Sequence, residues 1–120
     1  MDGKKEADQP DFAKDPEGNI TPKDSHMRLA NPRDPEFLKK HRLFRRAYSY
    51  SRGLASSGQL DVGLVFICYQ ANLADGFIFV QNLLNGEPLE EYISPFGGGY
   101  FFVLPGVEKG GFLGQGLLGV

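Results

Sequence analysis

The chain has 120 residues, which suits one small domain and is too short for two. Its formal net charge is -2 and its pI is about 5.6, so it lacks the basic balance of a nucleic-acid-binding protein. A single cysteine, Cys68, excludes an internal disulfide, and no apolar run approaches the roughly 20 residues of a membrane span.

The first third of the chain is polar. Residues 1–23 are predicted to form an irregular leader, because Asp, Lys, Pro and Gly dominate them. The sequence DSHMRLANPR at residues 24–33 predicts a short helix with a capping residue at its start and an end at Pro32. Residues 34–42 are expected to form a surface loop or a helical turn, with His41 exposed among charged neighbours.

The second half of the chain carries nearly all the aliphatic residues and is expected to supply the core. Residues 43–51 alternate and predict a strand, and the apolar run at 61–70 predicts a strand buried on both faces. Residues 72–86 have helical spacing, and residues 97–106 predict a third strand. This order predicts an α+β fold: a partial ferredoxin-like unit, with an antiparallel sheet and helices on one face.

His26 is the first candidate for chemistry. A lone histidine is more often structural or exposed than a metal ligand. However, Arg28 and Arg33 follow closely, and arginines suit an anionic cofactor such as haem, whose iron is often held by one histidine. The glutamates within 87–91 form a polar face, or one of them accepts a hydrogen bond from a ligand histidine. The residues alone leave both interpretations open.

A basic cluster spans residues 39–46. A solvated basic face explains it most simply, because too few basic residues lie elsewhere to extend a phosphate-binding patch. Arg45 and Arg46 lie within the predicted strand, where neighbouring side chains face opposite sides. One of the two is therefore expected to point inward and to need an anionic or polar partner.

Five separated stretches, DSHMRLANPR, RRAYSY, GLVFICYQ, LNGEPLEEY and GGGYFFVLPG, resemble the C-terminal half of dye-decolourising (DyP-type) haem peroxidases. The bacterial deferrochelatase/peroxidase subgroup is the most similar. The resemblance implies the C-terminal half of a two-domain fold, with residues 24–120 binding haem b. It implies hydrogen peroxide and a reducing organic substrate, a dye or a phenol, as reactants, or haem itself in a deferrochelatase.

The same resemblance implies roles for five residues. His26 matches the proximal haem ligand, and Glu87 is the acidic partner of that histidine. Arg45 matches the distal arginine that assists peroxide cleavage. Arg33 matches a residue that contacts a haem propionate, and Phe66 matches an apolar wall of the distal pocket.

One expected motif is missing. The family's distal aspartate lies in a G-x-x-D-G motif in the first half of the enzyme, and the string NLADG differs from it at the first glycine, so Asp75 receives no role. The chain is therefore expected to be a C-terminal fragment with little or no activity alone, with the missing N-terminal half as a partner. Apolar faces left uncovered predict self-association into a homo-oligomer.

Two further expectations concern location and alternatives. The resemblance implies that the parent protein is exported by the Tat route to the periplasm or cell surface, whereas the chain as printed shows no signal peptide and would be cytoplasmic. The alternatives to a peroxidase segment are a non-catalytic half-domain that binds haem or a partner, and an α+β interaction domain without cofactor.

Overall fold

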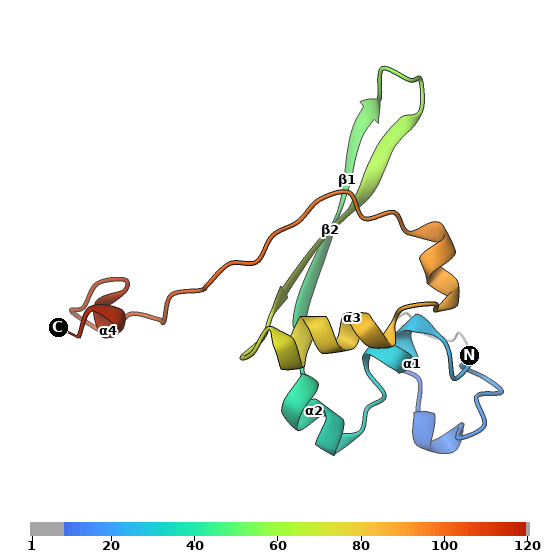
Figure 1. Cartoon of the computed structure of the whole chain (residues 1–120), viewed down its shortest axis with the longest axis horizontal. Coiled ribbons are helices and arrows are strands. Elements are labelled where there is room, and N and C mark those ends of the chain that lie inside the picture. Colours follow the sequence, from blue (N-terminus) through green and yellow to red (C-terminus); the bar gives the residue numbers. More distant parts are fainter. Residues whose placement is uncertain (1–8, 120) are drawn as a thin grey trace.

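The computed structural model of the protein describes residues 9–119. These residues form an α+β structure, as predicted, in which a long hairpin rises from a group of short helices (Figure 1). The elements in chain order are η1 (Phe12–Lys14), α1 (His26–Ala30), α2 (Pro35–His41), β1 (Phe44–Leu54), β2 (Leu60–Tyr69), η2 (Ala74–Ile78), α3 (Phe79–Leu83), η3 (Pro88–Tyr92) and α4 (Gln115–Leu118).

The helices begin where local chemistry favours it. The side chain of Asp34 accepts a hydrogen bond from the N–H of Phe37 at 2.8 Å, and Pro35 occupies the first turn of α2. The segment is therefore a helix, where the sequence predicted either a surface loop or a helical turn. The predicted helix at 24–33 is confirmed but shorter, since α1 covers only five residues. No helix within residues 9–119 is long and apolar enough to cross a membrane.

The strands β1 and β2 pair antiparallel in a two-stranded sheet, with an irregularity between Ser51 and Leu54 that bends the hairpin near its tip. Tyr50 lies opposite Gly63, and a Cβ atom at position 63 would stand 2.8 Å from the tyrosine ring. The aromatic ring therefore covers the glycine, which explains why this strand position carries no side chain. The helices meet one face of the hairpin where the rings of Phe66 and Phe77 lie 6.2 Å apart.

Of the strand predictions, one is wrong in part and one is wrong. The strand β2 exists, but it is exposed along nearly its whole length instead of being buried on both faces. Residues 97–106 form no strand, and they are exposed and make no backbone–backbone hydrogen bond within the described residues. A segment with an apolar strand pattern forms a strand only when a neighbouring strand pairs with it. No strand within the described residues pairs with 97–106.

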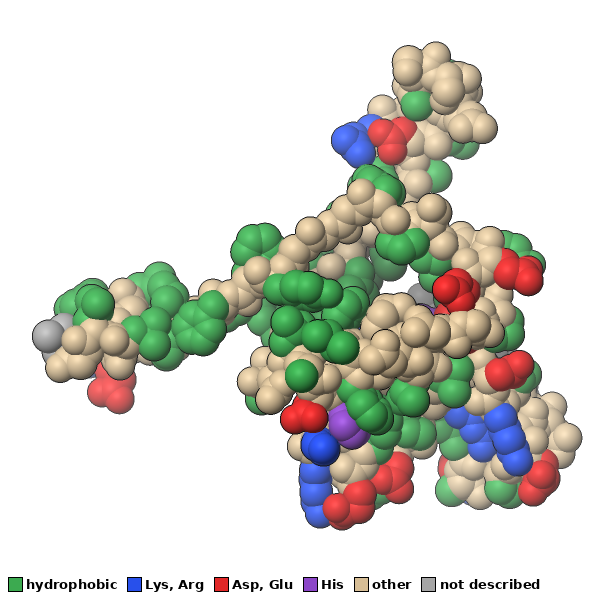
Figure 2. Space-filling view, in the orientation of Figure 1, with side chains coloured by type: hydrophobic (Ala, Val, Ile, Leu, Met, Phe, Trp, Pro, Cys, Tyr) green, Lys and Arg blue, Asp and Glu red, His purple; other side chains and the backbone are tan. Residues whose placement is uncertain are grey.

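The core also lies elsewhere than predicted. The buried hydrophobic residues are Phe12 of the leader and Val80 of α3, and the buried polar residues are Asp15, Thr21 and Glu87. Hydrophobic side chains of the hairpin and of the C-terminal segment lie open on the surface (Figure 2). The radius of gyration of 18.8 Å exceeds the roughly 14 Å expected for a compact domain of this length. The molecule is therefore an open one with a small core, to which both the leader and α3 contribute.

Candidate functional site

A histidine and a glutamate from distant parts of the sequence meet at the centre of the site. His26 opens α1, and Glu87 is the N-cap residue of η3. The Nδ1 atom of His26 lies 2.7 Å from Oε1 of Glu87. The histidine side chain is 45% exposed and the glutamate side chain 4% exposed, so a buried carboxylate supports an accessible imidazole.

The Glu87 carboxylate is fixed at both oxygens, because Oε2 accepts the N–H of Leu89 at 3.1 Å. Burial raises the pKa of this carboxyl, but the hydrogen bonds from His26 and from the Leu89 N–H outweigh it, so the pKa lies below its ordinary value. An ionised carboxylate can only accept, so Nδ1 of His26 carries the proton. The remaining ring nitrogen, Nε2, then presents a lone pair, the form in which histidine binds a metal.

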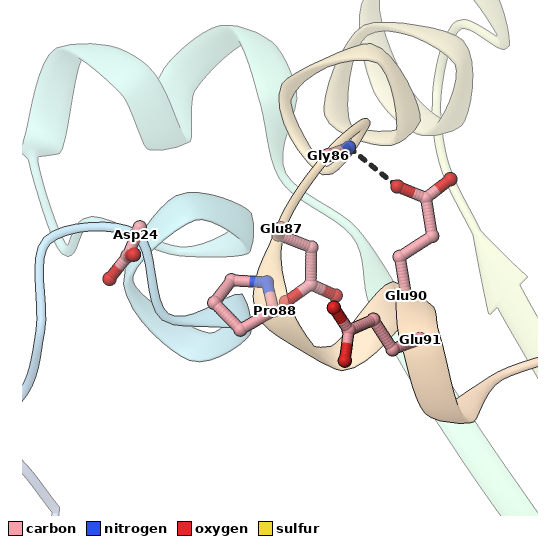
Figure 3. A pocket seen from close by; sticks show the side chains of 6 residues that line it. All are labelled: Asp24, Gly86, Glu87, Pro88, Glu90 and Glu91. Carbon is pink, nitrogen blue, oxygen red and sulfur yellow. Dashed lines mark hydrogen bonds between the residues drawn. The ribbon is translucent and has the colours of Figure 1, made fainter.

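A hollow of about 530 Å³ lies beside Glu87 (Figure 3). Gly86, with a φ of 81°, donates its N–H to the side chain of Glu90 at 2.6 Å, which closes the turn between α3 and η3. No group of three or more His, Cys, Asp or Glu side chains within residues 9–119 is arranged to hold a metal ion. The lining residues are Asp24, Gly86, Glu87, Pro88, Glu90 and Glu91.

Arg45 and Phe66 share one face of the hairpin. Arg45 lies opposite Cys68 and Ala47 lies opposite Phe66, and residues paired across an antiparallel ladder, like residues two apart, point the same way. This is the face that Phe77 of η2 contacts through Phe66. Both Arg45 and its neighbour Arg46 are exposed, so neither points into a protein interior as the sequence suggested. Only Arg45 lies on the helix-facing side.

Arg33 has two features that set it apart. It is the one non-glycine residue among those described with a positive φ, 61°, a conformation that costs about 1–3 kcal/mol. Its Nη1 donates to Gln9 at 2.7 Å, but its buried Nε has no partner. An unsatisfied N–H on a cation is suited to an anionic oxygen.

Two other sequence interpretations change. Arg28, expected beside an anionic cofactor, is 13% exposed and donates to the backbone oxygens of Asp15 and Thr21. His41, expected to be exposed, is half-buried: its ring stacks on Phe79 at 3.7 Å, and its Nδ1 lies 2.6 Å from the carbonyl oxygen of Asp75. The sequence revealed neither the contact of Arg28 with the leader nor that of His41 with Phe79 and Asp75.

The five predicted site residues therefore fall into three places. His26 and Glu87 form a hydrogen-bonded pair. Arg45 and Phe66 lie together on the hairpin, and Arg33 lies against the leader, its guanidinium 5.3 Å from the ring of Phe12. Within residues 9–119, no hydrogen bond or ring contact joins these three places.

Comparison with known proteins agrees with the pattern of motifs. The sequence model of the family described as "Dyp-type peroxidase, C-terminal" matches residues 2–108. Proteins named deferrochelatase are 57% identical: one from Yersinia pestis over 114 residues, 94% of this chain and 26% of the relative. Others, from Escherichia coli and Shigella flexneri, match over 116 residues, 96% of this chain and 27% of the relative. The chain thus spans about a quarter of the length of these curated relatives.

Proposed function

Because the chain belongs to the Dyp-type peroxidase family, as its C-terminal region, we propose that it provides the proximal haem-binding side of a haem-dependent peroxidase. The observation that carries the proposal is the 2.7 Å contact between Nδ1 of the accessible His26 and the buried carboxylate of Glu87. A carboxylate in this position fixes the imidazole tautomer and raises the basicity of the other ring nitrogen.

The proposed cofactor is haem b, and the residues fit it. A single histidine is enough to hold an iron whose other ligands belong to a porphyrin, so the lack of a larger ligand cluster among the described residues is no obstacle. His26 would hold the iron through Nε2, and Arg33 would direct its unpartnered Nε at a propionate. When bound, the haem would supply the redox chemistry of peroxide reduction.

The protein residues have separate tasks in this proposal. Glu87 keeps the proton on Nδ1 and holds the ring in place through its anchored carboxylate. Arg45 supplies a fixed positive charge that stabilises negative charge developing on a peroxide oxygen. Phe66, on the same hairpin face, forms an apolar wall beside that position.

The proposed reactants are hydrogen peroxide and a reducing organic substrate such as a dye or a phenol, with haem itself as the alternative substrate of a deferrochelatase. None of the residues given a role above supplies a carboxylate that moves protons on the peroxide. Asp75 does not fill this role, because its carbonyl binds His41 and its carboxylate lies 3.6 Å from Nζ of Lys40. We propose that the part corresponding to the remaining length of the relatives supplies that carboxylate, and that export is a property of the longer protein.

A non-catalytic half-domain that binds haem or a partner chain is the second candidate. The exposed hydrophobic side chains of β2 and of residues 100–104 favour it, since a partner that covers them would stabilise the structure. In the first candidate, and in the haem-binding form of the second, the His26–Glu87 pair binds haem. They differ in whether the chain reduces peroxide when its partner is added.

The test is a hemin titration of the chain followed at the Soret band, beside two matched variants. His26→Gln removes the proposed ligand, and His41→Gln changes the other histidine of the sequence. The expected result is a saturable, red-shifted band that His26→Gln abolishes and His41→Gln retains. An unchanged band in His26→Gln, or no saturable binding by the unmodified chain, would contradict the proposal.

A further inference from the structure

We propose that Asp15 and Arg28 are positioning residues for His26: a hydrogen-bonded clamp between the leader and α1 holds the imidazole against Glu87. The clamp consists of Asp15, the backbone of residues 19–21, and Arg28. Its significance for iron binding rests on the proposed function. Its effect on the His26–Glu87 contact is independent of haem.

The helix that carries His26 needs external support. α1 has only five residues, and isolated helices shorter than about 12 residues are marginal in water. Its N-cap residue, Ser25, makes no capping hydrogen bond, and its hydroxyl donates to the backbone oxygen of Pro22 at 2.7 Å. Contacts outside the helix must therefore determine where α1 and its first residue lie.

Arg28 supplies such contacts two residues after His26. Its Nη2 donates to the backbone oxygen of Asp15 at 2.8 Å, and its Nη1 donates to that of Thr21 at 2.9 Å. Its guanidinium lies 5.0 Å from the ring centre of Phe12, the buried aromatic residue of the leader. A planar guanidinium that is 13% exposed and bonded at two nitrogens fixes both the position and the rotation of a short helix.

Asp15 gives the arginine a rigid counterpart. Its carboxylate accepts the backbone N–H groups of Asn19 and Thr21, each at 2.8 Å, and so closes residues 15–21 into a tight loop. Both carbonyl oxygens that receive Arg28 belong to this loop. Asp15 and Thr21 are buried, which strengthens the network because water does not compete for its groups.

The other half of the pair is anchored separately. Glu87 is held by the N–H of Leu89 on η3, away from the leader. A hydrogen bond of 2.7 Å weakens steeply when its geometry is disturbed, so a small displacement or rotation of α1 is enough to break it. The clamp therefore acts on the histidine side of the pair, and η3 acts on the glutamate side.

The first test uses the haem-free chain with nitrogen-15-labelled histidine, studied by NMR at about pH 8, where an ordinary histidine is neutral. The variant Arg28→Lys keeps the charge and loses the planar fork. We expect the Nδ1–H form of His26 to fall several-fold in favour of the Nε2–H form. The signal of His41, which bonds the carbonyl of Asp75, should stay unchanged.

Arg52→Lys is the matched control, because Arg52 is 67% exposed on the hairpin and pairs only with Asp61 among the described carboxylates. It should leave both histidine signals unchanged. An Arg28→Lys protein whose His26 keeps the tautomer of the unmodified chain would overturn the proposal. Haem takes no part in this NMR measurement. A chain that fails to bind hemin would therefore refute the proposed function without changing the outcome of the NMR test.

A second measurement on the unmodified chain covers the case in which Arg28→Lys unfolds. The N–H of Thr21 is bonded to Asp15, and the N–H of Leu29 is bonded to Ser25 within α1. If the clamp holds the helix, both amides should exchange hydrogen in one opening event, with the same free energy and the same dependence on denaturant. Opening of the loop at Thr21 while Leu29 stays protected would overturn the proposal.

Discussion

The region around His26 and the region formed by the hairpin and residues 93–119 are stabilised in different ways. The first contains every residue that is buried in the described structure, both apolar and polar. The second exposes large hydrophobic side chains (Figure 2). For example, Leu64 is 59% exposed and Phe101 is 88% exposed. The His26–Glu87 pair thus lies in a region with internal support, whereas Arg45 and Phe66 lie in one that lacks it.

The physical reason is the range of the contacts. The loop and helices near His26 are held by hydrogen bonds and by a small core, which the described residues supply themselves. A two-stranded hairpin is marginal in water, because two strands bury little apolar surface and leave edges unpaired. We therefore expect the His26–Glu87 pair to form by itself and the hairpin to need an additional layer.

The same substitution in both regions should have very different effects. Val80 on α3 is 3% exposed, and Val65 on β2 is 46% exposed. We expect Val80→Ala to lower the free energy of unfolding by about 1–3 kcal/mol, and Val65→Ala to change it by less than about 0.5 kcal/mol. Urea denaturation of both variants measures this, and equal losses would remove the distinction between the regions.

Acid should weaken the first region selectively. Hydrogen bonds from backbone N–H groups, led by that of Thr21, hold the pKa of Asp15 below its ordinary value although burial opposes them. For Glu87, burial raises the pKa, but the hydrogen bonds from His26 and from the Leu89 N–H outweigh burial, so the pKa lies below its ordinary value. A carboxyl group whose pKa is lowered by folding stabilises the folded state at pH values above its pKa in the unfolded state. This stabilisation is lost as the pH falls and the group becomes protonated.

The stability of the region should therefore be retained down to about pH 4, the ordinary range of carboxyl groups, and should fall below it. Hydrogen exchange at the amide of Thr21, measured between neutral and acid pH, follows the loss. Asp15→Asn should reduce the pH dependence. A protection that stays constant through the acid range would show that these carboxylates do not support the fold.

The smallest expected effect concerns self-association. Uncovered apolar faces predict that the chain elutes above its monomer size in size-exclusion chromatography. Val65→Lys places a charge on the exposed β2 and should weaken the association several-fold, because burying an unpaired charge in an interface is unfavourable. The histidine tautomers should not change. A clean monomer of the unmodified chain would contradict the expectation that the hairpin needs a covering layer.

The sequence predicted local elements better than distant partners. Alternation and apolar runs located both strands, and a capping residue followed by Pro32 located α1. The resemblance paired His26 with Glu87, which the structure places in contact. Residues 97–106 have a strand pattern, but no strand within the described residues pairs with them. The pattern of one segment cannot reveal whether a partner strand exists. The contact of Arg28 with Asp15 also depends on the fold of a loop, and no periodicity encodes it.

The central claim, that Glu87 makes His26 a haem ligand, is tested most directly by comparing hemin affinity in Glu87→Gln and Glu91→Gln. Glu91 lies within η3 and Glu87 is the N-cap residue of η3, but only Glu87 contacts His26. The account predicts that Glu87→Gln weakens hemin binding by roughly 10- to 100-fold and that Glu91→Gln leaves it unchanged. Equal affinities in the two variants would contradict it.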